Sequence, residues 1–387
     1  MPINQDAFSI KKKGELKKEK ERAILVGVRL PSISAEEAAE SIEELAFLAD
    51  TAGAIVVDRV IQSRKSLNPA FYIGKGKVIE LKELALQKNA NLLIFDDDLR
   101  ARQVRNLEED SQIRVIDRTE LILDIFALRA RTREAKIQVE LAQMEYTLPR
   151  LKRMWTHFSK IEGGIGMRGP GETQLEEDKR LIKKRISNLK KSLQDIEKSR
   201  YTRRKGRAGF FNISLIGYTN AGKSTILNKL TGSDVLCENR LFATLDTTIR
   251  RLYLKDDITV LLSDTVGFIK KLPSHLVASF KSTLEELKEA DMLLHVIDTG
   301  HKNFEAHMLS VSDTLKELEI EHKPILYVFN KIDTIVEQGL TENLKARYEN
   351  SVFISALSGD GLQGLKDRIF QYYSQKFLTD KFCVNLC

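Results

Sequence analysis

Hydrophobic residues in the first third of the chain form short runs that are separated by amphipathic stretches. The runs have the length and aliphatic composition of buried strands, and they lie at 23–30, 54–60, 91–95 and 114–117. The stretches between them have helical periodicity, at 34–52, 77–88 and 99–109. Ser34 and Glu37 form a capping box before the first of these helices. This alternation predicts a small α/β domain with a parallel sheet over residues 23–130.

From about residue 131 the apolar positions follow two coiled-coil seams. The first seam advances by four and three residues alternately, and the second repeats every seven residues. Their members are Ile137, Leu141, Met144, Leu148 and Leu151, then Leu175, Ile182, Ile186, Leu189, Leu193 and Ile196. Two such helices bury their seams by packing antiparallel, so a long helical hairpin is predicted over 131–201. Pro149 should end or kink its first helix.

In the second half of the chain, four apolar runs are each followed by a short polar motif. The motifs begin at Gly217, Asp264, Asn330 and Ser355. Any one of them could arise by chance, whereas the whole set, in this order and after predicted strands, indicates a guanine-nucleotide site. The pattern predicts a Ras-like P-loop GTPase domain over 210–375.

The first motif has the pattern of a phosphate-binding loop. It consists of Gly217, Tyr218, Thr219, Asn220, Ala221, Gly222, Lys223 and Ser224, and the predicted helix after it includes Thr225. A glycine-containing turn between a strand and a helix directs backbone N–H groups at phosphate oxygens. We expect Lys223 to reach the β- and γ-phosphates and the Ser224 hydroxyl to bind Mg²⁺. An ordinary strand-to-helix turn is the alternative, and the flanking elements argue against it.

The second motif suits the γ-phosphate end of such a site. It reads Asp264, Thr265, Val266 and Gly267. The Asp264 carboxylate at a strand tip fits a partner of Mg²⁺ in its outer coordination sphere, and the Gly267 N–H can approach a γ-phosphate closely. The presence of that phosphate could then order the loop that follows.

The last two motifs suit the purine base. They read Asn330, Lys331, Ile332 and Asp333, and then Ser355, Ala356 and Leu357. The Asp333 carboxylate can accept two N–H groups from the edge of guanine, and adenine lacks that pair of donors. Asn330 would tie its loop to the phosphate loop, and Lys331 would lie along the base. The Ser355 segment would support the base through backbone groups, although Ser-Ala alone is a common turn.

Positive charge is concentrated in one segment. The chain carries a formal net charge of +7, and residues 183–207 alone carry +9, with 11 Lys or Arg and two acidic residues. A basic stripe of this kind attracts RNA phosphates; a solvated helix face is the alternative. The segment 163–171 has five glycines among nine residues, and we interpret it as a mobile tip that reaches into a large partner.

The other segments and the composition add few constraints. Residues 1–22 are expected to form a basic flexible tail and 202–209 a basic linker, whereas 376–387 form a short extension without an interpretation. No apolar run approaches the roughly 18 residues of a membrane span, and the first residues form no signal region. The three cysteines show no metal-binding spacing, which is typical of a reducing cytoplasm. We expect a cytoplasmic protein without a transmembrane segment.

Taken together, these motifs resemble those of HflX, a family of ribosome-associated GTPases in the translation-factor-related branch. Three further stretches carry the match, at 241–248, at 115–126 running on to 148–151, and at 164–175. The last stretch, Gly-Ile-Gly-Met-Arg-Gly-Pro-Gly-Glu-Thr-Gln-Leu, is the most specific. The resemblance covers about residues 23–375.

The resemblance implies a first switch loop at 241–248, which contains Phe242, Ala243, Thr244, Leu245 and Asp246. Thr244 is the implied second Mg²⁺ ligand beside Ser224, with Thr247 and Thr248 as alternatives. We therefore expect the residues of catalysis to be Lys223, Ser224, Thr244, Asp264 and Gly267.

Two positions depart from Ras-type enzymes. Phe268 stands where those enzymes have a Gln that orients the attacking water, so intrinsic hydrolysis should be slow. In similar GTPases an Asn at the position of Asn220 coordinates K⁺, which implies K⁺-stimulated hydrolysis. The alternative is that Asn220 only adopts the turn geometry, which Asn tolerates well.

The resemblance also implies a partner and a role. In its GTP form the chain would bind the large ribosomal subunit as a monomer, through the segments 183–207 and 163–171. The tip at 163–171 would then lie near the catalytic centre of the ribosomal subunit. Hydrolysis to GDP and phosphate would release the chain, in ribosome dissociation, rescue or biogenesis. The alternative is a ribosome-independent GTP-binding regulatory protein with negligible turnover, which Phe268 would allow.

Overall fold

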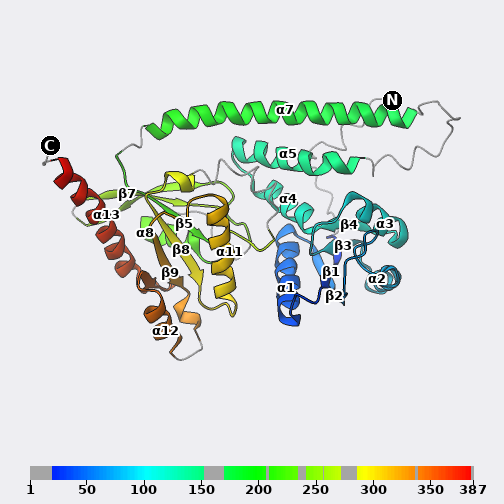
Figure 1. The fold of residues 1–387 in the computed structure, drawn as a ribbon, viewed down its shortest axis with the longest axis horizontal. Helices are drawn as coiled ribbons and strands as arrows, with labels where there is room; N and C mark the ends of the chain where they lie inside the picture. Colours follow the sequence, from blue (N-terminus) through cyan, green and yellow to red (C-terminus); the bar gives the residue numbers. More distant parts are fainter. Residues whose placement is uncertain are drawn as a thin grey trace. The chain divides into compact units, whose positions relative to one another are not determined.

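The computed structural model describes residues 20–151, 170–205, 209–233, 241–255, 257–271, 286–335 and 339–384. These residues fall into two compact units (Figure 1). The first unit comprises residues up to 96 together with 106–116, and the second comprises 97–105 and everything from 117 onward.

The first unit is built on a four-stranded sheet with the strand order β2-β1-β3-β4. The strands are β1 (Arg22–Arg29), β2 (Ile55–Ser63), β3 (Leu92–Phe95) and β4 (Arg114–Asp117). Strand β1 pairs in parallel with both β2 and β3, and its interior is buried. All four strands confirm the sequence prediction to within three residues at each end.

Helices α1 (Ala35–Ala52), α2 (Lys75–Lys88) and α3 (Ala101–Ser111) connect these strands. The capping box of α1 is present as predicted, because Ser34 Oγ accepts a hydrogen bond from Glu37 N and Glu37 Oε2 accepts one from Ser34 N. Ile42, Leu45 and Leu48 of α1 are buried in the core.

From residue 118 to 205, the described part of the second unit is largely helical. Its segments are α4 (Arg118–Arg129), α5 (Arg133–Thr147), the 3₁₀ helix η2 (Leu148–Arg150) and α7 (Pro170–Lys205). Helix α5 ends directly before Leu148-Pro149, as predicted from the proline. Helix α4 was not predicted from the sequence. Its apolar residues are buried on nearly all sides, so the helix lacks the one-sided pattern by which an amphipathic helix is recognised.

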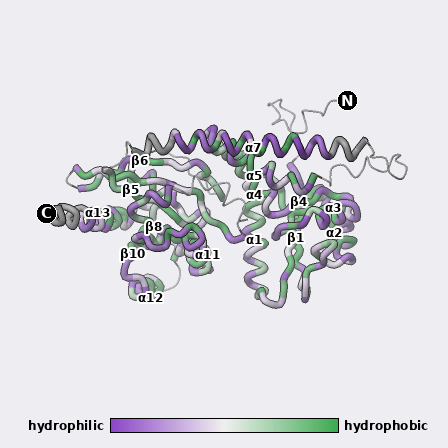
Figure 2. The backbone as a smooth tube through the Cα atoms, turned by 45° about the horizontal axis from the view of Figure 1, so that its top comes forward, coloured by the Kyte–Doolittle hydropathy of each residue, from purple (hydrophilic) through white to green (hydrophobic). Residues whose placement is uncertain are grey.

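Helix α5 packs against both α4 and α7. On the α7 side, the predicted seam is observed: Ile182 and Leu189 are buried, and Ile186, Leu193 and Ile196 are partly buried. Away from the seam, most of α7 is hydrophilic (Figure 2). The predicted tip lies outside the described residues, except for Pro170 and Gly171, which begin α7.

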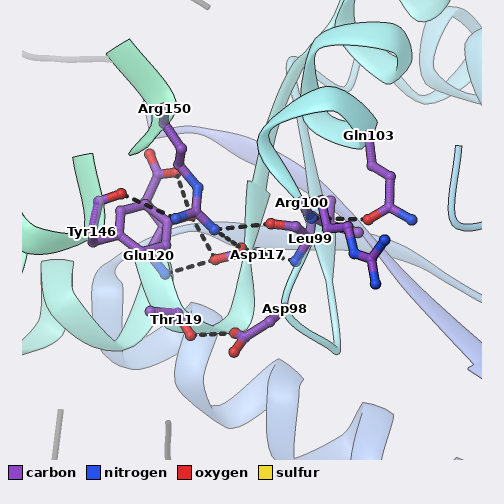
Figure 3. Close-up of polar contacts among 9 residues, drawn as sticks. All are labelled: Asp98, Leu99, Arg100, Gln103, Asp117, Thr119, Glu120, Tyr146 and Arg150. Carbon is purple, nitrogen blue, oxygen red and sulfur yellow. Dashed lines mark hydrogen bonds and ion pairs between the residues drawn. The ribbon is translucent and has the colours of Figure 1, made fainter. Parts of the chain in front are cut away.

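A buried polar cluster joins the end of the α5 segment to the start of α4 (Figure 3). The Asp117 carboxylate is fully buried and accepts hydrogen bonds from Glu120 N (2.9 Å), Leu99 N (3.1 Å) and Tyr146 Oη (2.8 Å). Arg150 Nη2 forms an ion pair with Asp117 at 3.3 Å and also donates to Leu99 O at 2.8 Å. Burial raises the pKa of the Asp117 carboxyl, whereas the backbone donors and Arg150 act to lower it.

The rest of the second unit is organised around a six-stranded sheet with the order β10-β9-β8-β5-β7-β6. Its strands are β5 (Asn212–Gly217), β6 (Thr248–Tyr253), β7 (Thr259–Asp264), β8 (Met292–Asp298), β9 (Ile325–Asn330) and β10 (Ser351–Phe353). Five strands run parallel, and β6 pairs antiparallel with β7 at one edge.

Helices cover both faces of this sheet. Helices α8 (Lys223–Thr231) and α13 (Leu362–Val384) supply Ile226, Leu227, Leu365 and Ile369 to one core cluster. On the other face, α11 (Phe304–Glu317) supplies Val311 and Leu315 to a second cluster, and Phe304 of α11 and Leu344 of α12 (Leu340–Arg347) share a third. Residues 376–384, for which the sequence offered no interpretation, continue α13.

Candidate functional site

The predicted phosphate loop connects the end of β5 to the start of α8. Gly222 directly precedes α8 and has a φ of 96°, a backbone conformation that glycine adopts without strain. A Cβ at this position would lie 2.3 Å from Asn330 Nδ2. The loop therefore requires glycine for two reasons: its backbone angle, and the close approach of a side chain from the predicted base-binding loop.

Lys223 is buried at the centre of this loop. Its Nζ donates to the carbonyl oxygens of Gly217 (3.1 Å) and Tyr218 (2.8 Å). Burial lowers the pKa of Lys223 to about 8, while the nearby Asp264 acts to raise it. A phosphate placed on this loop would add negative charge and favour the ammonium form.

The oxygens expected to hold Mg²⁺ are brought together. Ser224 Oγ lies 2.8 Å from Thr244 Oγ1 and donates to Asp264 Oδ2 at 2.6 Å. Burial raises the pKa of the Asp264 carboxyl, and Lys223 and the hydroxyl donors act to lower it. Asp264 Oδ1 is buried and has no hydrogen-bond partner among the described residues. Two hydroxyls and an unsatisfied carboxylate oxygen are ligands that suit hydrated Mg²⁺.

Among the three threonines proposed as the second Mg²⁺ ligand, the structure favours Thr244. The Thr244 hydroxyl contacts Ser224 Oγ, whereas Thr247 lines a separate cavity beside α5 and α7 and Thr248 begins β6. Two flanking residues of the first switch contact the helical segments α4 and α5. Phe242 is buried against Phe126, and Asp246 accepts hydrogen bonds from Arg131 N and Thr132 N.

The Asp264 motif crosses directly over the phosphate loop. Thr219 N donates to Phe268 O at 2.8 Å, and Phe268 N donates to Gly217 O at 3.1 Å. A Cβ at Gly267 would lie 2.8 Å from Thr219 Cα and 3.0 Å from Lys223 Nζ, so only glycine allows this approach. The Phe268 side chain is buried in a core cluster with Leu293 and other apolar residues, which leaves no polar group at this position to orient a water.

Asn330 connects the predicted base-binding loops to the phosphate loop. Its Nδ2 donates to Ala221 O at 2.8 Å, and its Oδ1 accepts from Ala356 N at 2.9 Å. Lys331 has a φ of 63°, and its Nζ forms an ion pair with Asp298 at 2.6 Å. Asp333 is exposed.

The Ser355 segment lies next to this loop through backbone contacts. Ile332 N donates to Ile354 O at 3.3 Å, and Ser355 N donates to Asp360 O at 3.0 Å. Ser355 and Ala356 are buried, whereas Leu357 is exposed. The Ala356 N–H donates to Asn330, and the Leu357 side chain lies outside the core.

The phosphate loop, the first switch and the Asp264 motif line one common cavity. Its lining residues are Thr219, Asn220, Gly222, Lys223, Ser224, Thr225, Phe242, Ala243, Thr244, Thr265 and Gly267. Ten of these were predicted from the motifs or the first switch, and Thr225 was predicted at the helix start. Tyr218 and Val266 lie outside this lining; Tyr218 instead stacks on His307 with ring centroids 3.8 Å apart.

Asp298, which forms an ion pair with Lys331, was not predicted from the sequence. Asp298 is the last residue of β8, a strand adjacent to β9 in the parallel sheet. Ligand sites of open α/β sheets lie at the carboxyl ends of their strands. Placing β8 from its apolar run would have brought Asp298 to the same edge as Asp264 and Asn330.

A parallel sheet flanked by helices, a phosphate loop before α8 and a base-specificity loop after β9 define a P-loop GTPase that binds guanine nucleotides. Three family models match the chain in sequence order. Residues 39–127 match "GTP-binding GTPase N-terminal", 129–207 match "GTP-binding GTPase Middle Region", and 212–331 match "50S ribosome-binding GTPase".

Full-length relatives define the family more narrowly. The chain is 42% identical to the GTPase HflX of Flavobacterium psychrophilum over 93% of this chain and 92% of the relative. It is 48% identical to that of Alkalihalophilus pseudofirmus (91% and 82% covered) and 42% identical to that of Escherichia coli (90% and 83% covered). The chain belongs to the HflX family of GTPases, and GTP hydrolysis is its activity.

A solved structure agrees with this assignment. The crystal structure of a protein named SsGBP in complex with GDP matches with a TM-score of 0.51 and 29% identity, covering 92% of this chain and 99% of that one. Within the described residues, no helix combines the length and apolarity that crossing a lipid bilayer requires.

Proposed function

We propose that this chain is a GTP-controlled factor of the cytoplasm that binds the large ribosomal subunit as a monomer in its GTP form and acts in ribosome dissociation, rescue or biogenesis. The observation that carries the proposal is the exposed basic surface of α7, a helix joined to a GTPase domain whose family model is described as ribosome-binding. RNA phosphates are the natural partner of such a surface.

The structure separates the basic residues of α7 into two groups. Arg185 and Lys190 form ion pairs with Glu140 and Glu145 of α5, at 2.6 Å and 2.8 Å. Lys183, Lys184 and Lys191 are exposed and make no ion pair among the described residues. The second group is therefore available to RNA, and Lys184 and Lys191 are seven residues apart on one face of the helix.

This division sharpens the test of the RNA-binding surface. Replacing Lys184 and Lys191 with Gln should weaken binding to isolated large ribosomal subunits and reduce the salt dependence of the affinity, because two phosphate contacts are lost. GDP affinity should be unchanged. The matched control replaces the exposed Lys229 and Lys302 of the GTPase domain with Gln, which removes the same charge. Equal binding by both double variants would refute the surface assignment.

Hydrolysis by this site depends on positioning and charge neutralisation. Lys223 and the backbone N–H groups of the phosphate loop would hold the phosphates, and Gly267 would contact the γ-phosphate. Ser224 and Thr244 would hold Mg²⁺, which when bound neutralises charge on the β- and γ-phosphates. Because Phe268 is buried and apolar, the isolated chain should hydrolyse GTP slowly.

The rate of hydrolysis distinguishes this proposal from a second candidate function. A ribosome-independent regulator with negligible turnover is favoured by the burial of Phe268. We expect large subunits to accelerate turnover by about tenfold or more, since the partner would order the attacking water. A rate that stays equally low with and without subunits would favour the regulator.

Asn220 is the proposed K⁺-coordinating residue. It is exposed with a φ of 61°, a turn geometry that Asn tolerates. This geometry is compatible both with K⁺ coordination and with a purely conformational role. Hydrolysis in K⁺ buffer should exceed that in Na⁺ buffer of equal ionic strength, and Asn220→Ala should abolish the difference. Equal rates of hydrolysis in the two buffers would show that Asn220 only adopts the turn geometry and does not coordinate K⁺.

A further inference from the structure

The first switch loop is held at two points that flank Thr244 symmetrically. Two residues before it, Phe242 packs edge-on against Phe126 of α4, with ring centroids 4.8 Å apart. Two residues after it, the Asp246 carboxylate binds the start of α5. We call these two contacts the switch anchors. Both belong to the second unit of the chain.

The Asp246 anchor is a set of hydrogen bonds at a helix N-terminus. Asp246 Oδ2 accepts from Arg131 N at 3.1 Å and from Thr132 N at 3.2 Å, and Asp246 Oδ1 accepts from the Thr132 hydroxyl. Thr132 is itself the N-cap of α5, since its Oγ1 accepts from Ala135 N at 3.1 Å. A carboxylate here also benefits from the positive end of the helix dipole.

The Phe242 anchor holds a strained residue. Phe242 has a φ of 54°, which is unfavourable for a bulky side chain and persists only where the surroundings enforce it. Both rings are buried, so apolar packing supplies that support. The two anchors therefore fix the backbone on each side of Thr244.

The anchors hold Thr244 next to Ser224, the other proposed Mg²⁺ ligand. The Thr244 hydroxyl lies 2.8 Å from Ser224 Oγ, so the two proposed Mg²⁺ ligands are already adjacent. We propose that Asp246 is a positioning residue: by binding Thr132, the N-cap of α5, it pre-organises Thr244 for the GTP form, and it thereby couples the nucleotide to the base of the helical hairpin. Because such coupling is reciprocal, GTP binding stabilises the start of α5 and hydrolysis weakens it.

The anchor lies beside open space. A cavity of about 570 Å³ is lined by Asp246, Thr247, Thr132 and residues of α5 and α7. The contact can therefore open without separating packed apolar side chains. A polar, reversible contact of this kind is suited to a switch.

The test uses the isolated full chain and compares affinities for GDP and for a non-hydrolysable GTP analogue, both with Mg²⁺. The inference rests on the proposed role of Thr244, so Thr244→Ala is measured in parallel. We expect Asp246→Ala to lower GTP-analogue affinity about fivefold or more relative to GDP affinity. Asp246→Asn retains an acceptor oxygen and should restore part of the preference.

Hydrogen exchange of the nucleotide-free protein gives a second readout. Asp246→Ala should accelerate exchange both in Leu241–Thr248 and at the first turn of α5, because one side chain restrains both. Ser34→Ala removes the N-cap of α1 and is the matched control for loss of a cap; it should change neither the GTP preference nor exchange in the first switch.

Two results would overturn the proposal. Asp246→Ala could lower GTP and GDP affinities equally, which would show a purely structural cap, or it could leave exchange in the first switch unaltered. If Thr244→Ala keeps the preference for GTP, the role of Thr244 fails, while the exchange data still decide whether Asp246 restrains the loop.

Discussion

At the scale of residues, the base-binding loops are joined to the phosphate loop by a few polar contacts that a single substitution can remove. Asn330 links three segments, since it reaches both Ala221 and Ala356. Asp333 is exposed and close in sequence to that link. We therefore propose that specificity for guanine rests on the Asp333 carboxylate, carried by a loop that Asn330 holds in place.

Replacing Asp333 with Asn should change base preference. The amide retains one acceptor and presents a donor to guanine N–H groups, so GDP affinity should fall roughly 10- to 100-fold. Xanthosine diphosphate, which carries a carbonyl where guanine has an amino group, should bind the variant better than it binds the parent. Calorimetric titration with both nucleotides measures this, and unchanged GDP affinity would show that Asp333 does not read the base.

Much of the candidate site was predictable at this scale because each motif follows a strand. Lys223, Ser224, Asp264 and Gly267 lie together, as their positions after β5 and β7 indicated. The contacts of Asp246 with α5 and of Asp298 with Lys331 were not predictable. Each joins segments far apart in the sequence, and no local pattern marks its partner.

At the scale of elements, the helical hairpin depends on a narrow apolar seam. Leu189 is buried in that seam, whereas Leu181 on the same helix is half exposed. The strands of the first unit and the α5 and α7 seams were predictable from periodicity. Helix α4 was not, since it is apolar on most sides, and neither was β6, whose central residues Arg250 and Arg251 are exposed.

Leu189→Ala should destabilise the hairpin by about 2–3 kcal/mol through lost burial and a residual cavity. The matched control is Leu181→Ala, which should cost less than about 0.5 kcal/mol because the side chain is already in solvent. Hydrogen exchange in residues 176–199 measures both. Equal protection in the two variants would show that the seam does not hold α7 against α5.

The cluster around Asp117 gives a pH-dependent prediction. A carboxyl whose folded pKa is raised contributes stability below its unfolded pKa of about 3.9 and loses it as pH rises through the folded pKa. Arg150→Met removes the positive charge that lowers the Asp117 pKa. The folded-state pKa of Asp117 then rises further, so the loss of folding stability with rising pH becomes larger and extends to higher pH.

We therefore expect Arg150→Met to destabilise α5 by about 3 kcal/mol at pH 7.5 and by less at pH 5. Arg150→Lys keeps a cation but not the fork of donors, so its destabilisation of α5 should lie between that of the parent chain and that of Arg150→Met. Protection of the α5 amides at the two pH values measures the effect. A cost that does not vary with pH would mean that the charge of Asp117 is not what Arg150 compensates.

At the scale of the whole molecule, a GTPase domain and a basic helical hairpin occur in one chain, and the first switch touches the start of that hairpin. Through this contact the γ-phosphate would influence binding of the proposed ribosomal partner. Such control requires that affinity for the large subunit depend on the bound nucleotide.

The most direct measurement is the dissociation constant for purified large ribosomal subunits in three states: with a non-hydrolysable GTP analogue, with GDP and without nucleotide. The account predicts that the GTP-analogue form binds at least about tenfold more tightly than the GDP form, which corresponds to about 1.4 kcal/mol. Equal affinity in all three states would contradict it, because the nucleotide would then exert no control over the partner.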